Sequence, residues 1–254
     1  MTERFEQIRA VVTGGASGIG LAIAKALTAE GASVAVLDVT PDVESPLTGI
    51  RADVRDRASV TAAVAEAAGR LGGIDVLINN AGISAVGTVE EATDDEWARV
   101  FDINVIGMAR VSAAALPFLR DSAHPAIVNV CSIAALIGLP QRVVYGASKG
   151  AVLALTFAMA TDHVHEGIRV NAVSPATVAT PFVERMLQGF ADPTAERAAL
   201  DARQATGRMV TPEEVADAVL YLADPRSAST TGTALQVDGG VHHLRPRQAG
   251  ARKN

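Results

Sequence analysis

Three polar residues in the middle of the chain have the types and the spacing needed for proton transfer. Tyr145 and Lys149 lie four positions apart at the start of an apolar stretch that predicts a helix over 145–160, so their side chains share one helix face. An ammonium fixed beside a phenol favours the phenolate, which makes tyrosine a usable acid and base near neutral pH. Ser132 ends a predicted strand, at the sheet edge where open α/β folds bind ligands. Each residue alone is more often structural, so their combination is what indicates catalysis.

A glycine-rich loop near the N-terminus has the pattern of a nucleotide-binding turn. A predicted strand runs directly into TGGASGIG at 13–20, and a predicted helix follows. The glycines let the backbone turn tightly and approach a pyrophosphate, whose charge then lies at the positive end of the helix dipole. An ordinary glycine-rich turn is the alternative, but the strand-turn-helix context favours dinucleotide binding. The loop residues predicted to contact the cofactor are Gly14, Ser17, Gly18, Ile19 and Gly20.

Asp38 closes the second predicted strand, where a carboxylate can accept hydrogen bonds from the adenosine ribose. The same carboxylate would repel a 2′-phosphate. No basic residue follows it at Val39 or Thr40, and the glycine loop has Ser17 where a basic residue could pair with that phosphate. The sequence therefore favours NAD over NADP. A structural aspartate at an exposed strand end is the alternative for Asp38 alone.

Short apolar runs rich in β-branched residues alternate with longer, alanine-rich stretches of helical periodicity. Several runs are apolar without alternation, as expected for strands that are buried on both faces of a parallel sheet. This order predicts an α/β fold, a single doubly wound domain whose seven-stranded parallel sheet has helices on both faces. The predicted strands are 9–13, 33–37, 49–52, 74–78, 126–131, 169–173 and 234–237.

Helices are predicted over 17–30, 56–69, 93–116 and 212–222, with Asp56, Thr93 and Thr211 as N-caps. The more polar segment 181–208 lacks a strand signal and interrupts the alternation. An insertion of this kind is more often a functional lid than a linker. We therefore expect one catalytic and cofactor-binding domain over 1–241 with a lid at about 181–208, followed by a C-terminal tail over 242–254.

Composition excludes several classes of protein. Of the 254 residues, 49% are hydrophobic, and the formal net charge is −6, which gives no basic field for nucleic acid. The single cysteine, Cys131, cannot form an intramolecular disulfide, and the charged N-terminal segment does not look like a secretory signal. The apolar region at 150–161 is shorter than the ~20 residues that a membrane span needs. We expect a cytoplasmic protein without nucleic-acid or membrane partners.

These motifs, in this order, resemble the short-chain dehydrogenase/reductase family over nearly the whole chain. The matching stretches are TGGASGIG at 13–20, Asp38, Asp53-Val54, NNAG at 79–82, Asn104, Ser132, YGASK at 145–149, NAVSPATVATP at 171–181 and VDGG at 237–240. The resemblance implies a single doubly wound domain with seven parallel strands, in agreement with the strands predicted from the apolar runs.

The resemblance also implies a role for each catalytic position. Tyr145 would exchange a proton with the substrate oxygen, Lys149 would assist it and bind the nicotinamide ribose, and Ser132 would hydrogen-bond the reacting oxygen. Asn104 would hold a water molecule that links Lys149 to solvent. The hydride chemistry itself belongs to the cofactor.

Further cofactor contacts follow from the same resemblance. Positions matching the adenine and adenosine contacts are Asp53, Val54, Asn80, Ala81 and Gly82, and those near the nicotinamide are Pro175, Val178 and Thr180. One departure stands out, because Ala176 follows Pro175 where the family usually has glycine. If that position needs a positive φ, alanine costs about 1 kcal/mol or changes the loop.

Arginines around the expected substrate region suggest an acidic substrate, since a guanidinium is the usual bidentate partner of a carboxylate. Arg142 precedes the tyrosine by three positions, and the lid contains Arg185, Arg197, Arg203 and Arg208. Each could equally be a solvated surface arginine. We expect Arg142, helped by Arg185 and Arg203, to bind the carboxylate of a small polyhydroxylated acid while Tyr145 and Ser132 contact the secondary alcohol.

The stretches at 136–149, 175–186 and 196–214 resemble dehydrogenases of 2-keto-3-deoxy-L-fuconate and related deoxy-sugar acids, and also 3-hydroxybutyrate dehydrogenases. A dehydrogenase of neutral alcohols or polyols is the alternative within the family. A non-catalytic NAD-binding protein is the remote one. The apolar helix at 145–160 and the resemblance together predict a homotetramer. We expect no metal site, because the adjacent His242 and His243 point apart and no third ligand is near in sequence.

Overall fold

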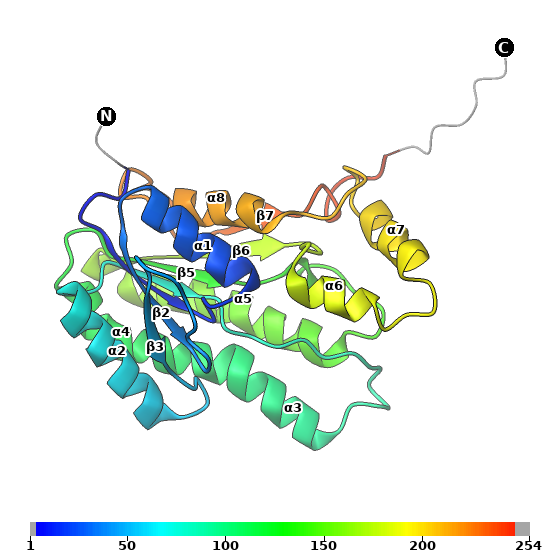
Figure 1. Ribbon diagram of the computed structural model, residues 1–254, viewed down its shortest axis with the longest axis horizontal. Coiled ribbons are helices and arrows are strands. Elements are labelled where there is room, and N and C mark those ends of the chain that lie inside the picture. The colour runs from blue at the N-terminus through cyan, green and yellow to red at the C-terminus, as the bar shows by residue number, and fades with distance from the viewer. Residues whose placement is uncertain (1–3, 247–254) are drawn as a thin grey trace, which may run out of the picture.

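The computed structural model describes residues 4–246, in which seven parallel strands form one sheet with the order β3-β2-β1-β4-β5-β6-β7 (Figure 1). The strands are β1 (Arg9–Thr13), β2 (Ser33–Asp38), β3 (Thr48–Arg51), β4 (Val76–Asn79), β5 (Ala126–Val130), β6 (Arg169–Pro175) and β7 (Ala234–Val237). The predicted fold class is confirmed. The first and last strands have the predicted bounds, and the others differ by one or two residues at one or both ends.

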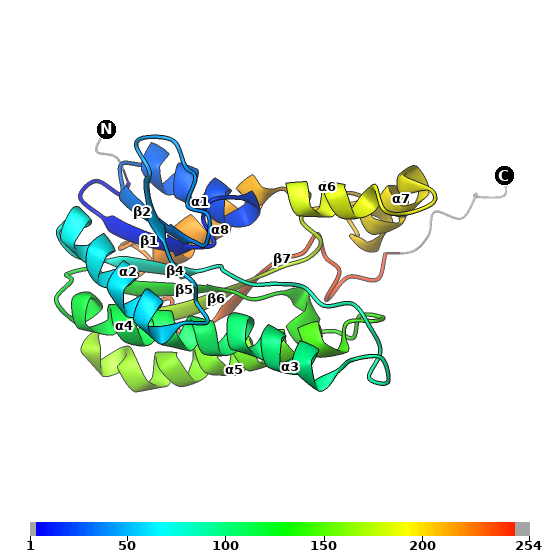
Figure 2. The same cartoon turned by 60° about the horizontal axis from the view of Figure 1, so that its bottom comes forward.

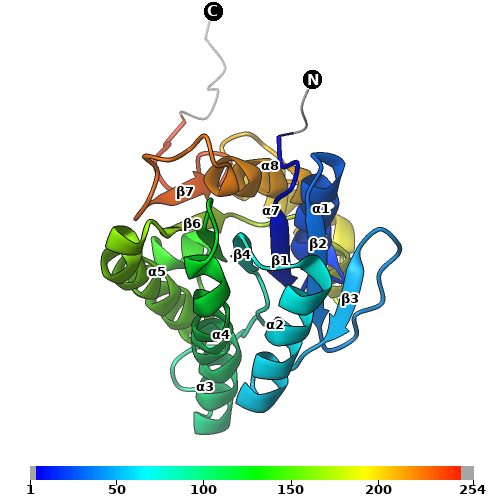
Figure 3. The ribbon, with the colours of Figure 1, turned by 90° about the vertical axis from the view of Figure 1, so that its left-hand side faces the viewer.

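Helices cover both faces of the sheet. On one face lie α1 (Gly18–Ala29) and α8 (Pro212–Ala223), and on the other lie α2 (Arg57–Leu71), α4 (Met108–Arg120) and α5 (Val143–His163), as Figure 3 shows in end view. Successive strand residues enter opposite cores: Val12 packs with Leu27 and Val215 on the first face, whereas Val11 packs with Val64 on the second. The apolar runs lack alternation because both faces of the strands are buried.

The stretch predicted as one helix over 93–116 is divided by a wider turn. It comprises α3 (Asp94–Phe101), the π-helical segment η1 (Asp102–Gly107) and α4, and Thr93 caps its start by accepting a hydrogen bond from Glu96 N at 3.2 Å. A Cβ at Gly107 would lie 2.9 Å from Val54 Cγ2, so glycine allows this turn to lie against the loop after β3. Single π-turns within helices often occur at functional sites, and this one contains Asn104.

The remaining helices lie between β5 and β7. Two are the short 3-10 turns η2 (Ile133–Ala135) and η3 (Val164–Glu166). The segment 181–208 forms α6 (Pro181–Leu187) and α7 (Pro193–Arg203), which share a small core of Leu187, Leu200 and Met209. Both views in Figures 1 and 2 show α6 and α7 beyond the end of the sheet. Because this segment follows β6, it lies beyond the carboxyl edge of the sheet.

Two helical stretches, Asp94–Arg120 and Val143–Glu166, are long and apolar enough to cross a membrane by length and composition alone. The buried side chains of these stretches, such as Val111, Leu119 and Val152, pack into the cores beside the sheet. Core helices of a globular domain pass the same test, so length and composition do not identify these helices as membrane spans.

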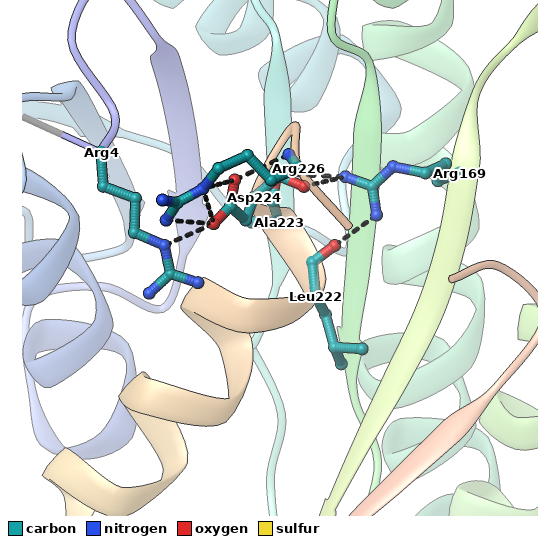
Figure 4. A network of polar contacts seen from close by, with 6 residues as sticks. All are labelled: Arg4, Arg169, Leu222, Ala223, Asp224 and Arg226. Atoms are coloured by element: carbon teal, nitrogen blue, oxygen red, sulfur yellow. Dashed lines mark hydrogen bonds and ion pairs between the residues drawn. The ribbon is translucent and has the colours of Figure 1, made fainter. Parts of the chain in front are cut away.

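A buried arginine closes the end of α8 (Figure 4). The guanidinium of Arg169, on β6, donates hydrogen bonds to the carbonyls of Leu222 at 2.6 Å and of Ala223 and Asp224 at 3.1 Å. These are carbonyl groups that a helix C-terminus leaves without partners. The Asp224 side chain accepts hydrogen bonds from Arg4 Nε at 2.6 Å and from Arg226 NH2 at 2.8 Å. The network thereby joins the sheet, α8 and the N-terminal segment.

We predict that Asp224→Asn removes a contribution to the free energy of unfolding that depends on pH. Burial raises the pKa of Asp224, but hydrogen bonds from Arg226 and Arg4 outweigh burial and lower the pKa to about 2. Because an unfolded aspartate titrates near pH ~4, the carboxylate stabilises the fold above that pH and loses this contribution as the pH falls toward 2. The contribution is about 1–2 kcal/mol, since both arginines are partly solvated.

The measurement is the free energy of unfolding in urea at about pH 7 and about pH 3. The wild-type chain should lose more stability between these two values than Asp224→Asn does, and the difference between the two proteins should be largest near neutral pH. An identical loss in both proteins would contradict the role of Asp224.

Candidate active site

The residues predicted to do chemistry meet at the carboxyl edge of the sheet. Gly14 follows β1, Asp38 ends β2, Asn80 follows β4 and Ser132 lies two residues after β5. Strands β1, β4 and β5 are neighbours in the sheet. Parallel strands place their carboxyl ends on one edge, so residues far apart in the sequence come together there.

The glycine loop is shaped by close contacts that only glycine allows. Gly14 and Gly18 have positive φ values of +62° and +53°, and a Cβ at Gly20 would lie 2.3 Å from the carbonyl oxygen of Gly14. Ser17 is the N-cap residue of α1 but makes no side-chain hydrogen bond to the helix. The first amide groups of α1 therefore lack a side-chain cap at a positive helix end, which suits a phosphate group.

Thr13 and Asn80 hold the loop in place. Thr13 Oγ1 accepts hydrogen bonds from the amides of Asn80 and Ala81 at 3.0 and 3.1 Å. In return, Asn80 Nδ2 donates to the carbonyls of Thr13 and Gly14, each at 3.0 Å. Sequence analysis did not assign a role to Thr13, although a hydroxyl residue between a buried strand and a glycine loop could have indicated one.

Asp38 lies beside the glycine loop. Its Oδ2 accepts a hydrogen bond from Ala16 N at 3.2 Å, and its Oδ1 accepts one from Thr40 N at 3.1 Å. These two amides fix the carboxylate at the end of β2, and each oxygen keeps a lone pair for a ligand hydroxyl. A fixed negative charge at this point suits a ribose with free hydroxyl groups.

Asp53 and Val54, at the predicted adenine contact, are also structurally engaged. Arg55 donates hydrogen bonds to both carboxylate oxygens of Asp53, with Arg55 NH2 at 2.6 Å from Oδ2, and these bonds lower the pKa of Asp53. Arg110 NH1 donates to the carbonyl of Val54 at 3.2 Å. These contacts fix the loop after β3 against the π-turn at Gly107.

The sequence predicts that Ser132, Tyr145 and Lys149 form a catalytic group. Ser132 is buried, and its Oγ accepts a hydrogen bond from Ala134 N at 3.1 Å. Lys149 is also buried; its Nζ donates to the carbonyl of Val130 at 2.9 Å and lies 5.7 Å from the centroid of the Tyr145 ring. Within residues 4–246 no carboxylate pairs with Lys149, so its charge acts on Tyr145 and on whatever binds beside it.

Asn104 connects the cofactor side of the site to the catalytic helix. Its Oδ1 accepts a hydrogen bond from Ile83 N at 2.8 Å, and its Nδ2 donates to Ile83 O at 3.0 Å and to Ser148 Oγ at 3.1 Å. The Ser148 hydroxyl donates in turn to the carbonyl of Tyr145 at 2.7 Å. Both amide hydrogens of Asn104 are thus used within the protein, and a water molecule held here has to bind a carbonyl oxygen.

Ser148 was missed by sequence analysis. It lies three residues after Tyr145 and directly before Lys149, at a spacing that brings its hydroxyl onto the turn that carries both. Cys131 also lies beside Lys149, with its Sγ 3.3 Å from the Lys149 carbonyl oxygen. Burial raises the pKa of the Cys131 thiol although the charge of Lys149 opposes this, so the group is an inert packing residue at neutral pH.

The loop after β6 lies against the glycine loop. Thr180 Cγ2 would lie 3.6 Å from a Cβ at Gly18, and Val178 forms an isolated bridge with Val210. The strain considered for Ala176, which follows Pro175, does not arise. Among the described residues other than glycine, only Gln7 and Gln141 have positive φ, and Ala176 N donates to the carbonyl of Val237 at 3.1 Å.

The arginines named from the sequence divide into two groups. Arg197 pairs with Glu184 at 2.6 Å and Arg208 pairs with Glu214 at 2.7 Å, so both are engaged on the surface. Arg142 is half-buried; its NH1 donates to Ser84 Oγ at 3.1 Å and to Ala85 O at 3.0 Å. Among the described carboxylates, none pairs with Arg142.

Electrostatics show what lies near Arg142. Burial lowers the pKa of its guanidinium, the nearby Tyr145 raises it, and the positive charge of Arg203 lowers it. The charge of Arg203 is thus near enough to act on Arg142, and an anion bound at Arg142 would offset that repulsion. Arg185 lies exposed on α6, and the structure brings no contact between it and Arg142.

Taken together, the site can hold a dinucleotide along the carboxyl edge and a small anion beside Tyr145. The glycines leave room that a Cβ would fill, and the start of α1 lacks a side-chain cap. Within the described part of the chain, His, Cys, Asp and Glu residues form no group of three that could hold a metal ion. The arrangement suits proton transfer from or to a substrate oxygen.

Comparison with known proteins supports this description. Residues 14–242 match the family profile described as "Enoyl-(Acyl carrier protein) reductase". The chain is 38% identical over 252 residues to 2-(S)-hydroxypropyl-CoM dehydrogenase 3 of Xanthobacter autotrophicus. The aligned region covers 95% of this chain and 99% of that protein. It is 39% identical over 251 residues to cis-4-hydroxycyclohexanecarboxylate dehydrogenase of Sinomonas cyclohexanicum, covering 94% of this chain and 98% of the relative.

A solved structure gives the same result for the fold. The ligand-free aldohexose dehydrogenase of Thermoplasma acidophilum superimposes with a TM-score of 0.92 at 33% sequence identity. The superposition covers 98% of this chain and 100% of that one.

Proposed function

The chain belongs to the short-chain dehydrogenase/reductase family and is an oxidoreductase that acts on secondary alcohols, and from that premise we propose that it uses NAD to interconvert a hydroxy acid and its oxo acid. The state of Arg142 supports an acidic substrate, because its guanidinium is half-buried beside Tyr145 and has no carboxylate partner among residues 4–246. The class of acid includes both deoxy-sugar acids, such as 2-keto-3-deoxy-L-fuconate, and simpler hydroxy acids.

Binding of the dinucleotide would use the carboxyl edge of the sheet. The amides at the start of α1 and the glycine loop would bind the pyrophosphate, and Asp38 would accept hydrogen bonds from the adenosine ribose. The Asp38 charge, with Val39 and Thr40 following it, supports NAD over NADP, because a 2′-phosphate would meet a carboxylate and no cation in these positions. Asp53, Val54 and residues 80–82 would surround the adenosine, while Pro175, Val178 and Thr180 would adjoin the nicotinamide.

When bound, the nicotinamide supplies the hydride acceptor or donor. The residues of the chain supply the proton. In the direction of oxidation, Tyr145 Oη takes the proton of the substrate hydroxyl while Ser132 Oγ hydrogen-bonds the same oxygen. The ammonium of Lys149, which keeps two donors beyond its bond to Val130, stabilises the negative charge on Tyr145 and can bind ribose hydroxyls. Asn104 and Ser148 hold the turn on which Tyr145 and Lys149 lie.

A non-catalytic cofactor-binding role is disfavoured by the chain itself. Such a protein needs none of the four groups Asn104, Ser132, Tyr145 and Lys149, and here all four are present. A preference for neutral alcohols or polyols is the competing hypothesis for the substrate. In that case Arg142 would serve only to join the loop at Ser84 and Ala85 to the start of α5.

We also propose that the protein is cytoplasmic and assembles as a homotetramer. Helix α5 exposes Phe157 by 44%, and the neighbouring Val164 by 46%, on a face that a second copy could cover. The single cysteine suits a reducing compartment.

Substitution of the tyrosine tests the proposed activity. Tyr145→Phe should lower kcat with any substrate by about 10³-fold or more, because it removes the group that exchanges the proton. The affinity for NADH should stay within about twofold, since the phenol oxygen contributes little to holding the dinucleotide. Steady-state NADH formation and fluorescence titration with NADH provide the two values, and turnover that persists in Tyr145→Phe would overturn the assignment.

Substitution of Arg142 tests the substrate class. Arg142→Gln removes the charge but keeps a polar side chain that can hydrogen-bond, and should raise KM for hydroxy acids by about 10- to 100-fold while leaving neutral alcohols unchanged. Arg197→Gln is the matched control, because Arg197 is already paired with Glu184 on the surface, and it should behave as wild type. An unchanged preference for acids over neutral alcohols in Arg142→Gln would remove the proposed carboxylate site.

A further inference from the structure

We propose that the active site continues into a cavity that binds the hydrocarbon body of the acid, so that the preferred substrate is a hydroxy or oxo acid with a saturated apolar skeleton rather than a polyhydroxylated sugar acid. This inference rests on the proposed function, because it takes Arg142 as the group that binds the carboxylate. It specifies the chemistry of the rest of the substrate, which is its carbon skeleton.

The cavity has a volume of about 320 Å³, at the lower end of the range for ligand pockets. One side comes from Gly87 and Thr88, in the loop after β4, and the other from the segment that joins β5 to α5. Ala134, which lines it, follows Ser132 by two residues, and Gly146, which also lines it, follows Tyr145 directly. Ser132 and Tyr145 do not line the cavity themselves, but near neighbours of both in the sequence do, and Arg142 is part of its wall.

Main-chain contacts hold the two sides of the cavity in place. Gly87 N donates to the carbonyl of Gln141 at 2.9 Å, and Gly87 and Arg142 form an isolated parallel bridge. Gln141 has a positive φ of +54°, an uncommon conformation for a residue with a side chain. Arg142 NH1 is fixed by Ser84 and Ala85, which leaves its other nitrogen atoms available to a carboxylate. These contacts fix the two sides of the cavity and the position of Arg142 in its wall.

The walls of this cavity are apolar apart from three side chains. Ala134, Ile137, Leu139 and Val143 line it, whereas only Thr88, Gln141 and Arg142 bring polar side-chain atoms. Val86 and Val89, on the loop beside it, are exposed by 60% and 69%. With Arg142 assigned to the carboxylate, two polar side chains remain for any further hydroxyl groups. A saturated hydrocarbon ring or chain brings no polar group of its own that would lack a partner here.

The number of hydroxyl groups decides between the two kinds of acid. A sugar acid brings several hydroxyls, and each one that enters this apolar space without a partner is bound less well than the corresponding CH group. A mainly apolar pocket discriminates against an added hydroxyl by up to about 100-fold. A ring such as that of 4-hydroxycyclohexanecarboxylate, which one relative is named for, carries one carboxylate, one hydroxyl and otherwise only CH groups, which suits a cavity with Arg142 in its wall and apolar side chains around it.

The test compares two acids that share one skeleton. Quinate has the cyclohexanecarboxylate ring with additional hydroxyl groups, so it is the matched partner of 4-hydroxycyclohexanecarboxylate. With NAD and the wild-type chain, we expect kcat/KM for the cis or trans isomer of 4-hydroxycyclohexanecarboxylate to exceed that for quinate by about 100-fold. An open-chain aldonic acid should be as poor a substrate as quinate, and 3-hydroxybutyrate provides a short acid that leaves most of the cavity empty.

A substitution at a glycine that lines the cavity provides an independent test. Gly138 lines the cavity, and a Cβ added there meets nothing within 4 Å, so a larger side chain can be introduced without a clash. Gly138→Leu should lower kcat/KM for 4-hydroxycyclohexanecarboxylate about tenfold or more, because it occupies space that the ring needs, and should leave 3-hydroxybutyrate within about threefold. Gly69→Leu is the control, because Gly69 lies on α2 and also has nothing within 4 Å of its Cβ position.

The outcomes separate this inference from the function on which it rests. Turnover of quinate or an aldonic acid equal to that of the hydrocarbon acid overturns the inference but leaves the hydroxy-acid dehydrogenase intact. Equal effects of Gly138→Leu on the long and the short acid also overturn it. NAD-dependent turnover of neutral alcohols without turnover of any acid overturns both the inference and the proposed substrate class.

Discussion

The buried ammonium of Lys149 is the constraint on which the site depends. A charged amine out of contact with water is costly unless something compensates it, yet among the described residues Lys149 has only the carbonyl of Val130 at 2.9 Å and the ring of Tyr145 at 5.7 Å. The compensation is incomplete in the protein alone. In the proposed mechanism it becomes complete when negative charge develops on Tyr145 and when ribose hydroxyls bind, so that stability of the fold would be exchanged for stabilisation of the reacting state.

The surrounding structure serves to hold that charge in place. Asn104 lies in a π-turn that rests on Val54, and it joins Ile83, in the loop after β4, to Ser148 in the second turn of α5. Thr13 and Asn80 fix the glycine loop from the neighbouring strands. A displacement of the loop after β4 or of α5 would therefore strain the hydrogen bonds that Asn104 makes to both. The proposed substrate end is less constrained, since it depends on two loops that meet at Arg142 and on the short helices α6 and α7.

Much of this arrangement could be predicted from the sequence, for identifiable reasons. Strands such as β5 were recognisable because both of their faces are buried, and helix starts were recognisable from capping residues such as Thr93 and Thr211. The π-turn at Asn104 was not, because its residues have the same composition and periodicity as the helix around it, and only contact with Val54 shows why Gly107 is needed. Likewise Arg142 and Arg185 looked alike in sequence, and only tertiary structure separates a half-buried guanidinium from an exposed one.

The most direct test is to replace Lys149 by methionine and to measure thermal unfolding and NAD-dependent turnover on the same preparation. Methionine fills similar space without charge, so Lys149→Met should unfold at the same or a higher temperature while turnover falls by about 10³-fold or more. That combination would show that the buried charge is kept for chemistry. A lower unfolding temperature together with turnover near that of wild type would show instead that Lys149 is a structural residue, and would contradict the catalytic role assigned to it.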